Sequence, residues 1–172
     1  MKIKIIASAL LSLFLVAGAQ AQKKEKRESP PATTEANIGE TKVKIDYSQP
    51  SVKGREVFGK LVPFGKVWRT GANEATTIEF SKDVMIQGKK LAAGKYSLFT
   101  IPGEKEWTII FNSVSNQWGS YRYKEDKDVL RVKAGVSNHE ATEKLTISID
   151  AKTGMVHIDW ASTRVRFEIK ES

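Results

Sequence analysis

The sequence predicts an all-β protein: an antiparallel β-sandwich of jelly-roll or immunoglobulin-like type, with about eight or nine strands and a long loop over one end. Two observations lead to this fold class. Beyond residue 40, apolar and polar residues alternate with a period of two, as in strands that bury one face. Glycine and proline punctuate these runs at short intervals, and no long stretch has the 3.6-residue period of a helix.

Residues 1–21 have the order of a secretory signal peptide. Two lysines precede an uncharged, mainly apolar run, and Ala19-Gln20-Ala21 supplies the small residues that signal peptidase needs. The run is short for a membrane span, which needs about 20 apolar residues. We expect cleavage after Ala21 rather than an uncleaved anchor. The protein would then be exported, to the periplasm or as a secreted protein, with no membrane span after cleavage.

Residues 22–37 mix charges of both signs with Pro30-Pro31 and contain no large apolar side chain. Such a segment cannot bury enough surface to offset the entropy lost on ordering, so we expect a flexible leader. The rest of the chain, residues 38–172, is expected to form a single β-sandwich domain.

Within that domain each alternating run predicts one strand with a buried and a solvated face. A run over 107–111 is apolar on both faces apart from Thr108, which indicates a central strand. The other expected strands lie at residues 43–47, 76–80, 90–92, 95–101, 145–149, 156–160 and 165–169.

Residues 48–76 interrupt the alternation. Structureless loops longer than about 12–15 residues are uncommon in compact domains and are often functional. The segment is rich in cations and carries Phe58, Leu61, Phe64 and Trp68. We expect these apolar side chains to hold it over one open end of the sandwich.

Within this loop, residues 68–76 (WRTGANEAT) concentrate groups that can bind a ligand. An arginine can clamp a carboxylate or phosphate, amide and hydroxyl groups both donate and accept, and a glycine lets a ligand approach the backbone. The glutamate could act as an acid or base only if burial raised its pKa. The candidate ligand-binding residues are Trp68, Arg69, Thr70, Gly71, Asn73 and Glu74.

The same residues also fit a purely structural role. In that interpretation Arg69 and Glu74 form a buried ion pair, Asn73 caps a turn and Trp68 belongs to the core. A second aromatic segment leaves a similar choice open: Trp118 and Tyr121 could stack on a sugar, or Trp118 could plug the edge of the core. The usual burial of tryptophan favours the plug.

The segments WRTGANEATTIEFS and GKKLAAGKYSLFTIPGEKEWTIIFN resemble the bacterial family catalogued as domain of unknown function 2911. The resemblance begins near Tyr47-Ser48-Gln49-Pro50-Ser51, passes through Trp118-Gly119 and Asp128-Val129-Leu130, and weakens toward the carboxyl end. It implies an exported protein of the kind found in Bacteroidetes-like bacteria. It also implies that Arg69, Gly71, Asn73, Glu74 and Thr76 belong to the family motif, and it supplies no catalytic residue.

Composition excludes several classes of function. With no cysteine in the sequence, disulfides, thiol catalysis, cysteine-bound zinc and a lipoprotein anchor are ruled out, and two histidines cannot make a three-histidine metal site. We expect no metal and no cofactor. The net charge of +8 is spread along strands and the amino-terminal segments rather than gathered in a basic patch, so nucleic-acid binding is not expected.

The most economical function is a non-catalytic binding module for a small polar or anionic ligand, a glycan or an envelope partner. Two alternatives stay open: a small periplasmic hydrolase that uses Glu74 and Arg69, and a structural envelope protein without a ligand. We favour a non-enzymatic role because no set of nucleophile, histidine and acid is recognisable, and we assign no catalytic residue. The sequence leaves the ligand and the oligomeric state open.

Overall fold

A computed structural model describes residues 27–172, so the expected signal peptide and the start of the expected leader lie outside the described residues. The described part contains nine strands, one short 3-10 helix and no α-helix. The elements are β1 (Pro31–Ile38), β2 (Thr41–Ser48), β3 (Thr77–Phe80), β4 (Val84–Ile86), β5 (Lys89–Leu91), β6 (Gly94–Ile101), β7 (Glu106–Asn112), η1 (Glu125–Lys127), β8 (Asp128–Asp150) and β9 (Met155–Glu171).

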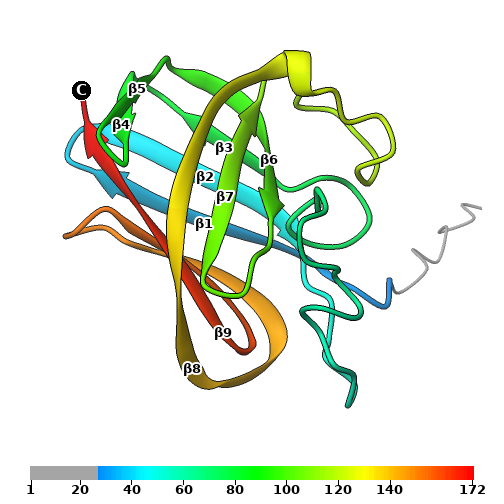
Figure 1. The fold of residues 1–172 in the computed structure, drawn as a ribbon. Helices are drawn as coiled ribbons and strands as arrows, with labels where there is room; N and C mark the ends of the chain where they lie inside the picture. The colour runs from blue at the N-terminus through cyan, green and yellow to red at the C-terminus, as the bar shows by residue number, and fades with distance from the viewer. Residues whose placement is uncertain (1–26) are drawn as a thin grey trace, which may run out of the picture.

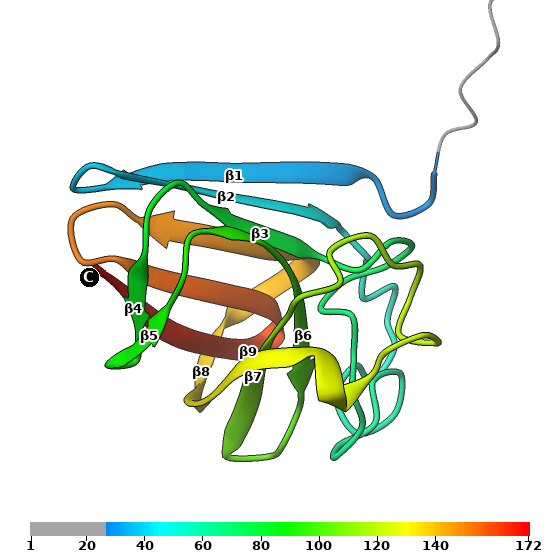
Figure 2. The same ribbon diagram turned by 90° about the horizontal axis from the view of Figure 1, so that it is seen from above.

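All nine strands join one antiparallel sheet in the order β1-β2-β3-β6-β7-β8-β9-β4-β5 (Figure 1). The order is linear, so the sheet is open, with β1 and β5 at its edges. The predicted all-β class and antiparallel pairing are confirmed. The two layers expected of a sandwich arise here because one sheet curls over itself: β1 and β2 lie over the second half of β8 (Figure 2).

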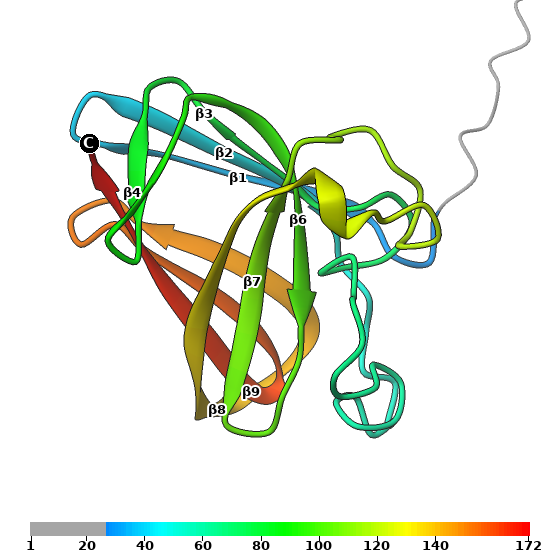
Figure 3. The same ribbon diagram turned by 45° about the horizontal axis from the view of Figure 1, so that its top comes forward.

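The curl is made by the two longest strands. β8 pairs with β7 through Gly135 and with β9 from Val136 onward, and Figure 3 shows both long strands bending. The register between them shifts twice, between Asn138 and Thr142 and between Thr142 and Thr146. Such bulges bend a strand and increase its twist.

These shifts also change which residues face the core. In β8 the buried positions move from Val132 and Ala134 to Leu145 and Ile147, which is a change from even to odd numbers. In β9 they move from Trp160 to Val165 in the same way. The runs that we expected to form separate strands at 156–160 and 165–169 are therefore the two halves of β9, and the run at 145–149 belongs to β8.

The concave side of the sheet encloses one main hydrophobic core to which every strand contributes a buried residue. Its largest fully buried side chains include Trp107, Trp160, Phe80, Phe111 and Phe167. Each such side chain stabilises the fold by about 1.5–3 kcal/mol through removal of apolar surface from water.

One prediction about the amino-terminal segment is wrong. Residues 31–37, assigned to the flexible leader, lie in β1, and all eight of its residues pair with β2. The inward positions of β1 are small, such as Ala32 and Ala36, so the segment has no strong apolar alternation. Its order comes from the backbone ladder, supported by a hydrogen bond from Thr34 Oγ1 to the Ile147 carbonyl at 2.6 Å.

The long connection between β2 and β3 lies at one end of the curled sheet, as expected (Figure 3). It is tied to the sheet by isolated bridges from Ser51 to Lys144 in β8 and from Trp68 to Thr100 in β6. Of the four apolar side chains expected to hold it there, Trp68 is buried and Phe58 packs against the core, whereas Leu61 and Phe64 are 42% and 39% exposed. Among residues 27–172 there is no helix with the length and apolar character required to cross a bilayer.

Candidate functional site

The motif at residues 68–76 is a loop whose two ends are fastened to β6. Trp68 and Thr100 exchange backbone hydrogen bonds of 2.7 and 2.9 Å, and Leu98 donates to the Thr76 carbonyl at 2.7 Å. A bond of 3.1 Å from the Thr76 amide to the Arg69 carbonyl closes the loop. The scaffold beneath the candidate residues is therefore fixed by the sheet.

Inside the loop, Thr70 and Asn73 both have left-handed backbone conformations, with φ of 56° and 59°. Asparagine tolerates this region, but it is costly for a β-branched threonine. The Thr70 side chain is fully buried, and its hydroxyl donates to Thr100 Oγ1 at 3.1 Å. A methyl group on Gly71 would lie 3.0 Å from the Ser48 carbonyl oxygen, so only glycine fits there without displacement.

Trp68 belongs to an aromatic cluster under the loop. Its indole stacks on Trp160, with centroids 5.8 Å apart and an interplanar angle of 16°. Phe58 and Trp107 meet Trp68 edge to face at 5.9 and 6.0 Å. The Trp68 Nε1 group donates to the Gly71 carbonyl at 3.1 Å, so the ring also fixes the motif backbone.

Arg69, the next residue after Trp68, is not part of this aromatic cluster and lines a cavity of about 300 Å³. Its Nε group is buried and has no hydrogen-bond partner within residues 27–172. Burial, which removes water from the guanidinium, lowers the pKa of Arg69; Tyr121 acts in the opposite direction. A buried donor without a partner is costly, by about 1–3 kcal/mol, so its presence calls for a physical reason.

We call this space the basic cavity. It is lined by four cationic side chains, Lys53, Arg55, Lys66 and Arg69, and by one carboxylate, Glu28, among the described residues. Its apolar lining comes from Pro50, Leu61, Val62, Pro63, Val67, Trp68, Ala72 and Trp160. The volume is at the lower end of the range of about 300–1,000 Å³ that is usual for ligand sites.

The neighbouring cations are only partly neutralised. Arg55 donates to the carbonyls of Ser51 and Val52 at 2.6 and 3.0 Å, which orients its guanidinium without cancelling its charge. Lys53 pairs with Glu28 at 3.1 Å. Within the described part of the chain Lys66 forms no ion pair. The cavity therefore favours an anion.

Glu74 lies elsewhere. It lines a second, more open cavity of about 520 Å³, which we call the Glu74 cavity, and pairs with Arg27 at 2.8 Å. The hydrogen bond from Arg27 is the main cause that lowers the pKa of Glu74. The structural interpretation is thus wrong on one point, the buried ion pair between Arg69 and Glu74: the carboxylate is 48% exposed and its partner is Arg27.

The hydrogen bonds of Asn73 fix neighbouring segments of the chain and do not face an open site. Its Nδ2 group donates to the Ser29 carbonyl at 3.2 Å and to Ser48 Oγ at 3.3 Å, and its carbonyl accepts from the Gly119 amide at 3.0 Å. Of the six candidates, the structure brings Trp68, Arg69 and Gly71 together at the basic cavity. It places Thr70 in the packed interior and Glu74 at the other cavity.

Sequence reasoning did not assign Lys53, Arg55, Lys66 and Trp160 to this site. The three cations lie in the same loop, and their density there was the signal that could have identified them. Trp160 comes from β9, some ninety residues along the chain, and its place in an alternating strand carries no sign of a cavity.

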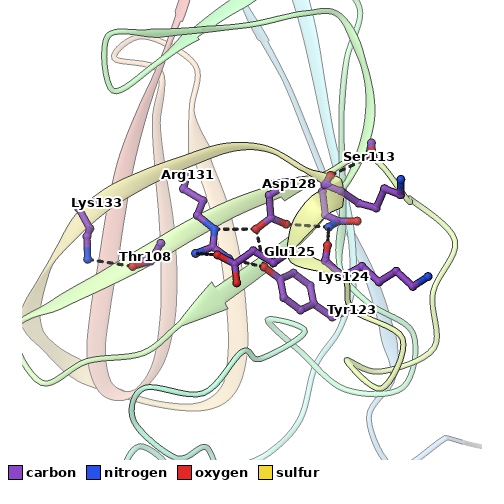
Figure 4. Close-up of polar contacts among 10 residues, drawn as sticks. Thr108, Ser113, Tyr123, Lys124, Glu125, Asp128, Arg131 and Lys133 are labelled. Carbon is purple, nitrogen blue, oxygen red and sulfur yellow. Dashed lines mark hydrogen bonds and ion pairs between the residues drawn. The ribbon is translucent and has the colours of Figure 1, made fainter.

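A second polar cluster surrounds Asp128 at the start of β8 (Figure 4). The Asp128 carboxylate is only 5% exposed and accepts from Arg131 Nε at 2.7 Å, Asn112 Nδ2 at 2.8 Å and the Tyr123 hydroxyl at 2.5 Å. Desolvation, aided by Asp128, raises the pKa of Tyr123 to about 12. The donors and acceptors satisfy one another, which fits a structural network that closes the loop after β7.

In the part of the chain that the structure describes, no three side chains of histidine, aspartate or glutamate gather in a way that could hold a metal ion. Asp159, at the bend of β9, is instead clamped by Arg164 through two bonds of 2.7 Å.

Trp118 and Tyr121 are 58% and 87% exposed. The expectation that Trp118 plugs the core edge is therefore wrong: the loop after β7 holds the ring outside, with its backbone bridged to Glu74. Neither aromatic residue is among those that line the basic cavity.

A family model described as "Protein of unknown function (DUF2911)" matches residues 29–169. Comparison with curated proteins finds no match, and comparison with solved structures finds none either. The matched range includes every residue of the motif and all of β1.

Proposed function

We propose that this chain, which belongs to the DUF2911 family, is an exported binding module that holds a small oxyanion in the basic cavity and does not transform it. Export is proposed from the signal-like pattern of residues 1–21. The observation that carries the binding role is Arg69, a half-buried guanidinium with an unpartnered Nε group at a cavity lined mainly by cations and apolar side chains.

The chemistry of the lining supports a particular kind of ligand. A guanidinium recognises carboxylate or phosphate through paired hydrogen bonds. Pro50, Pro63 and Leu61 add apolar surface beside the cations. A compact carboxylate or phosphate on a short apolar body uses both features.

A neutral glycan is less well supported at this cavity. Sugar rings bind on open aromatic faces, but Trp68 and Trp160 stack on each other and are 7% and 2% exposed. Phe58 packs against both indoles in edge-to-face arrangements, with ring centroids 5.9 Å apart in each pair. The rings shape the wall of the cavity without offering a free face.

A hydrolase that uses Arg69 and Glu74 on one substrate finds no support in this placement, because the two side chains line different cavities. The other alternative, a structural protein without a ligand, also fits a motif of which most residues are packed. The two functions differ in the role that they give to Arg69. A structural arginine should have partners and should stabilise the fold when present.

The test is calorimetric titration of the purified protein with phenyl phosphate and with inorganic phosphate. We expect phenyl phosphate to bind and Arg69→Met to weaken that binding about tenfold or more, since a hydrogen bond to a charged group contributes about 1.5–3 kcal/mol. Arg166→Met removes the same charge from an exposed position of β9 outside the cavity lining and is the matched control. Absence of binding, or equal binding by both variants, would count against the proposal.

A further inference from the structure

Residues 27–29, the first that the structure describes, lie across the motif and contact two of its residues, Glu74 and Asn73. Arg27 Nη1 pairs with Glu74 at 2.8 Å at the Glu74 cavity. The Ser29 carbonyl accepts from Asn73 Nδ2 at 3.2 Å. Between them, Glu28 reaches the basic cavity and pairs with Lys53 at 3.1 Å. We call residues 27–29 the strap.

Glu28 carries a negative charge at a cavity whose other charged lining residues are all cations. It is the one carboxylate among the described residues that lines the basic cavity, where it meets a cation of the site. An anionic ligand that reached Lys53 would seek the same contact. The Glu28 carboxylate therefore stands where a ligand oxyanion could stand.

The contact is weak enough to be exchanged. The side chains of Glu28 and Lys53 are 87% and 56% exposed, and exposed ion pairs contribute only about 0.2–1 kcal/mol. What keeps Glu28 near Lys53 is the anchoring of its neighbours in the chain, by Asn73 on one side and Glu74 on the other.

We infer that the strap is an internal competitor for the site proposed above, with Glu28 as a substitute anion at Lys53 and with Asn73 and Glu74 as the residues that position it. The inference rests on the proposed function, because competition needs a ligand that binds in the basic cavity. In this role Asn73 and Glu74 influence ligand binding without contacting the ligand.

The expected effect follows from population arithmetic. A ligand that must first displace Glu28 binds with an affinity reduced by the fraction of molecules in which the site is open. Since the competing pair is exposed, its removal should raise the affinity about two- to fivefold, the range that corresponds to the weak pair.

The experiment measures phenyl phosphate binding by titration calorimetry to wild type and to Glu28→Gln. The matched control is Glu40→Gln. Glu40 is a similarly exposed carboxylate, 82% against 87%, which also pairs with a single lysine, Lys82. It lies at the turn between β1 and β2, at the opposite end of β1 from the strap (Figure 2). Both variants change net charge equally, so a general charge effect raises affinity in both.

A second variant tests the anchor. Asn73→Gly removes the donor to Ser29 while keeping a residue that adopts a positive φ, so the motif backbone is not strained. We expect it to raise affinity as Glu28→Gln does. In the double variant the two effects should not add, because each opens the same contact. Thermal unfolding of each variant confirms that the compared proteins are folded.

The outcomes separate the two proposals. Tighter binding by Glu28→Gln and not by Glu40→Gln supports the strap. If Arg69→Met loses binding but Glu28→Gln binds like wild type or more weakly, the strap is overturned and the anion site stands. If neither wild type nor Glu28→Gln binds phenyl phosphate or inorganic phosphate, the proposed function fails, and the strap fails with it.

Discussion

Arg69 and Glu74 belong to one nine-residue motif, yet they line different cavities, and Glu74 is paired with Arg27 rather than with Arg69. Arg69 lines the basic cavity and its buried Nε group has no hydrogen-bond partner among the described residues, while the glutamate is paired with Arg27. This separation assigns different tasks to the two charges. It also makes their effects on stability and binding individually measurable.

The first prediction concerns the stability of Arg69→Met. We expect its free energy of unfolding to equal that of wild type or to exceed it by about 1 kcal/mol, because a buried donor without a partner is removed and the apolar stem is retained. Urea unfolding monitored by tryptophan fluorescence measures this. A loss of more than about 1 kcal/mol would favour the structural interpretation of the motif.

A second prediction concerns the tight packing at Gly71. Gly71→Ala places a methyl group 3.0 Å from the Ser48 carbonyl oxygen and 3.1 Å from Thr76 Oγ1. We expect a loss of about 1–3 kcal/mol, as for other overpacked sites. Gly135→Ala is the control, since nothing lies within 4 Å of its added methyl group. Equal unfolding midpoints for the two variants would show that the motif yields more easily than its contacts suggest.

The third prediction is an alkaline transition at Tyr123. Its pKa is raised to about 12, so the folded state prefers the neutral phenol, and the stability it contributes is present below the ordinary value of 10.0. That contribution should be lost as pH rises from about 10 to about 12. Unfolding measured across this window should show the decline in wild type and less of it in Tyr123→Phe.

Tyr121→Phe removes the same hydroxyl from a side chain that is 87% exposed and serves as the control for that experiment. If Tyr123→Phe and wild type declined in parallel between pH 10 and 12, Tyr123 would not be the group responsible. Below pH 10 we expect Tyr123→Phe to be less stable by about 1–2 kcal/mol, because Asp128 and Arg131 each lose a partner.

The fourth prediction is acid release of the strap anchor at Glu74. Its pKa is lowered by Arg27, so the contact stabilises the folded state above the ordinary value of 4.5 and is lost as pH falls through the lowered value. Because both side chains are 48% exposed, the effect should stay below about 1 kcal/mol. Wild type should therefore exceed Glu74→Gln in stability near pH 7, and the difference should vanish in acid. A difference that persists in acid would contradict this.

The sequence by itself was sufficient for the all-β class, because strands with one buried face impose a period of two that residues such as Val43 and Ile45 display openly. It did not reveal β1, whose inward residues are small and whose order comes from pairing with β2. It also could not show that β8 and β9 are continuous, since a bulge reverses the alternation and makes one strand look like two.

The sequence likewise identified the loop and motif in which Arg69 lies, because the long interruption and its polar groups are visible in the linear chain. Only the tertiary structure decided that Arg69 and Glu74 line different cavities. The chain turns through left-handed residues at Thr70 and Asn73, which no periodic pattern encodes. It also decided that Trp160 meets Trp68, a contact between residues ninety-two positions apart that depends on how the whole sheet curls.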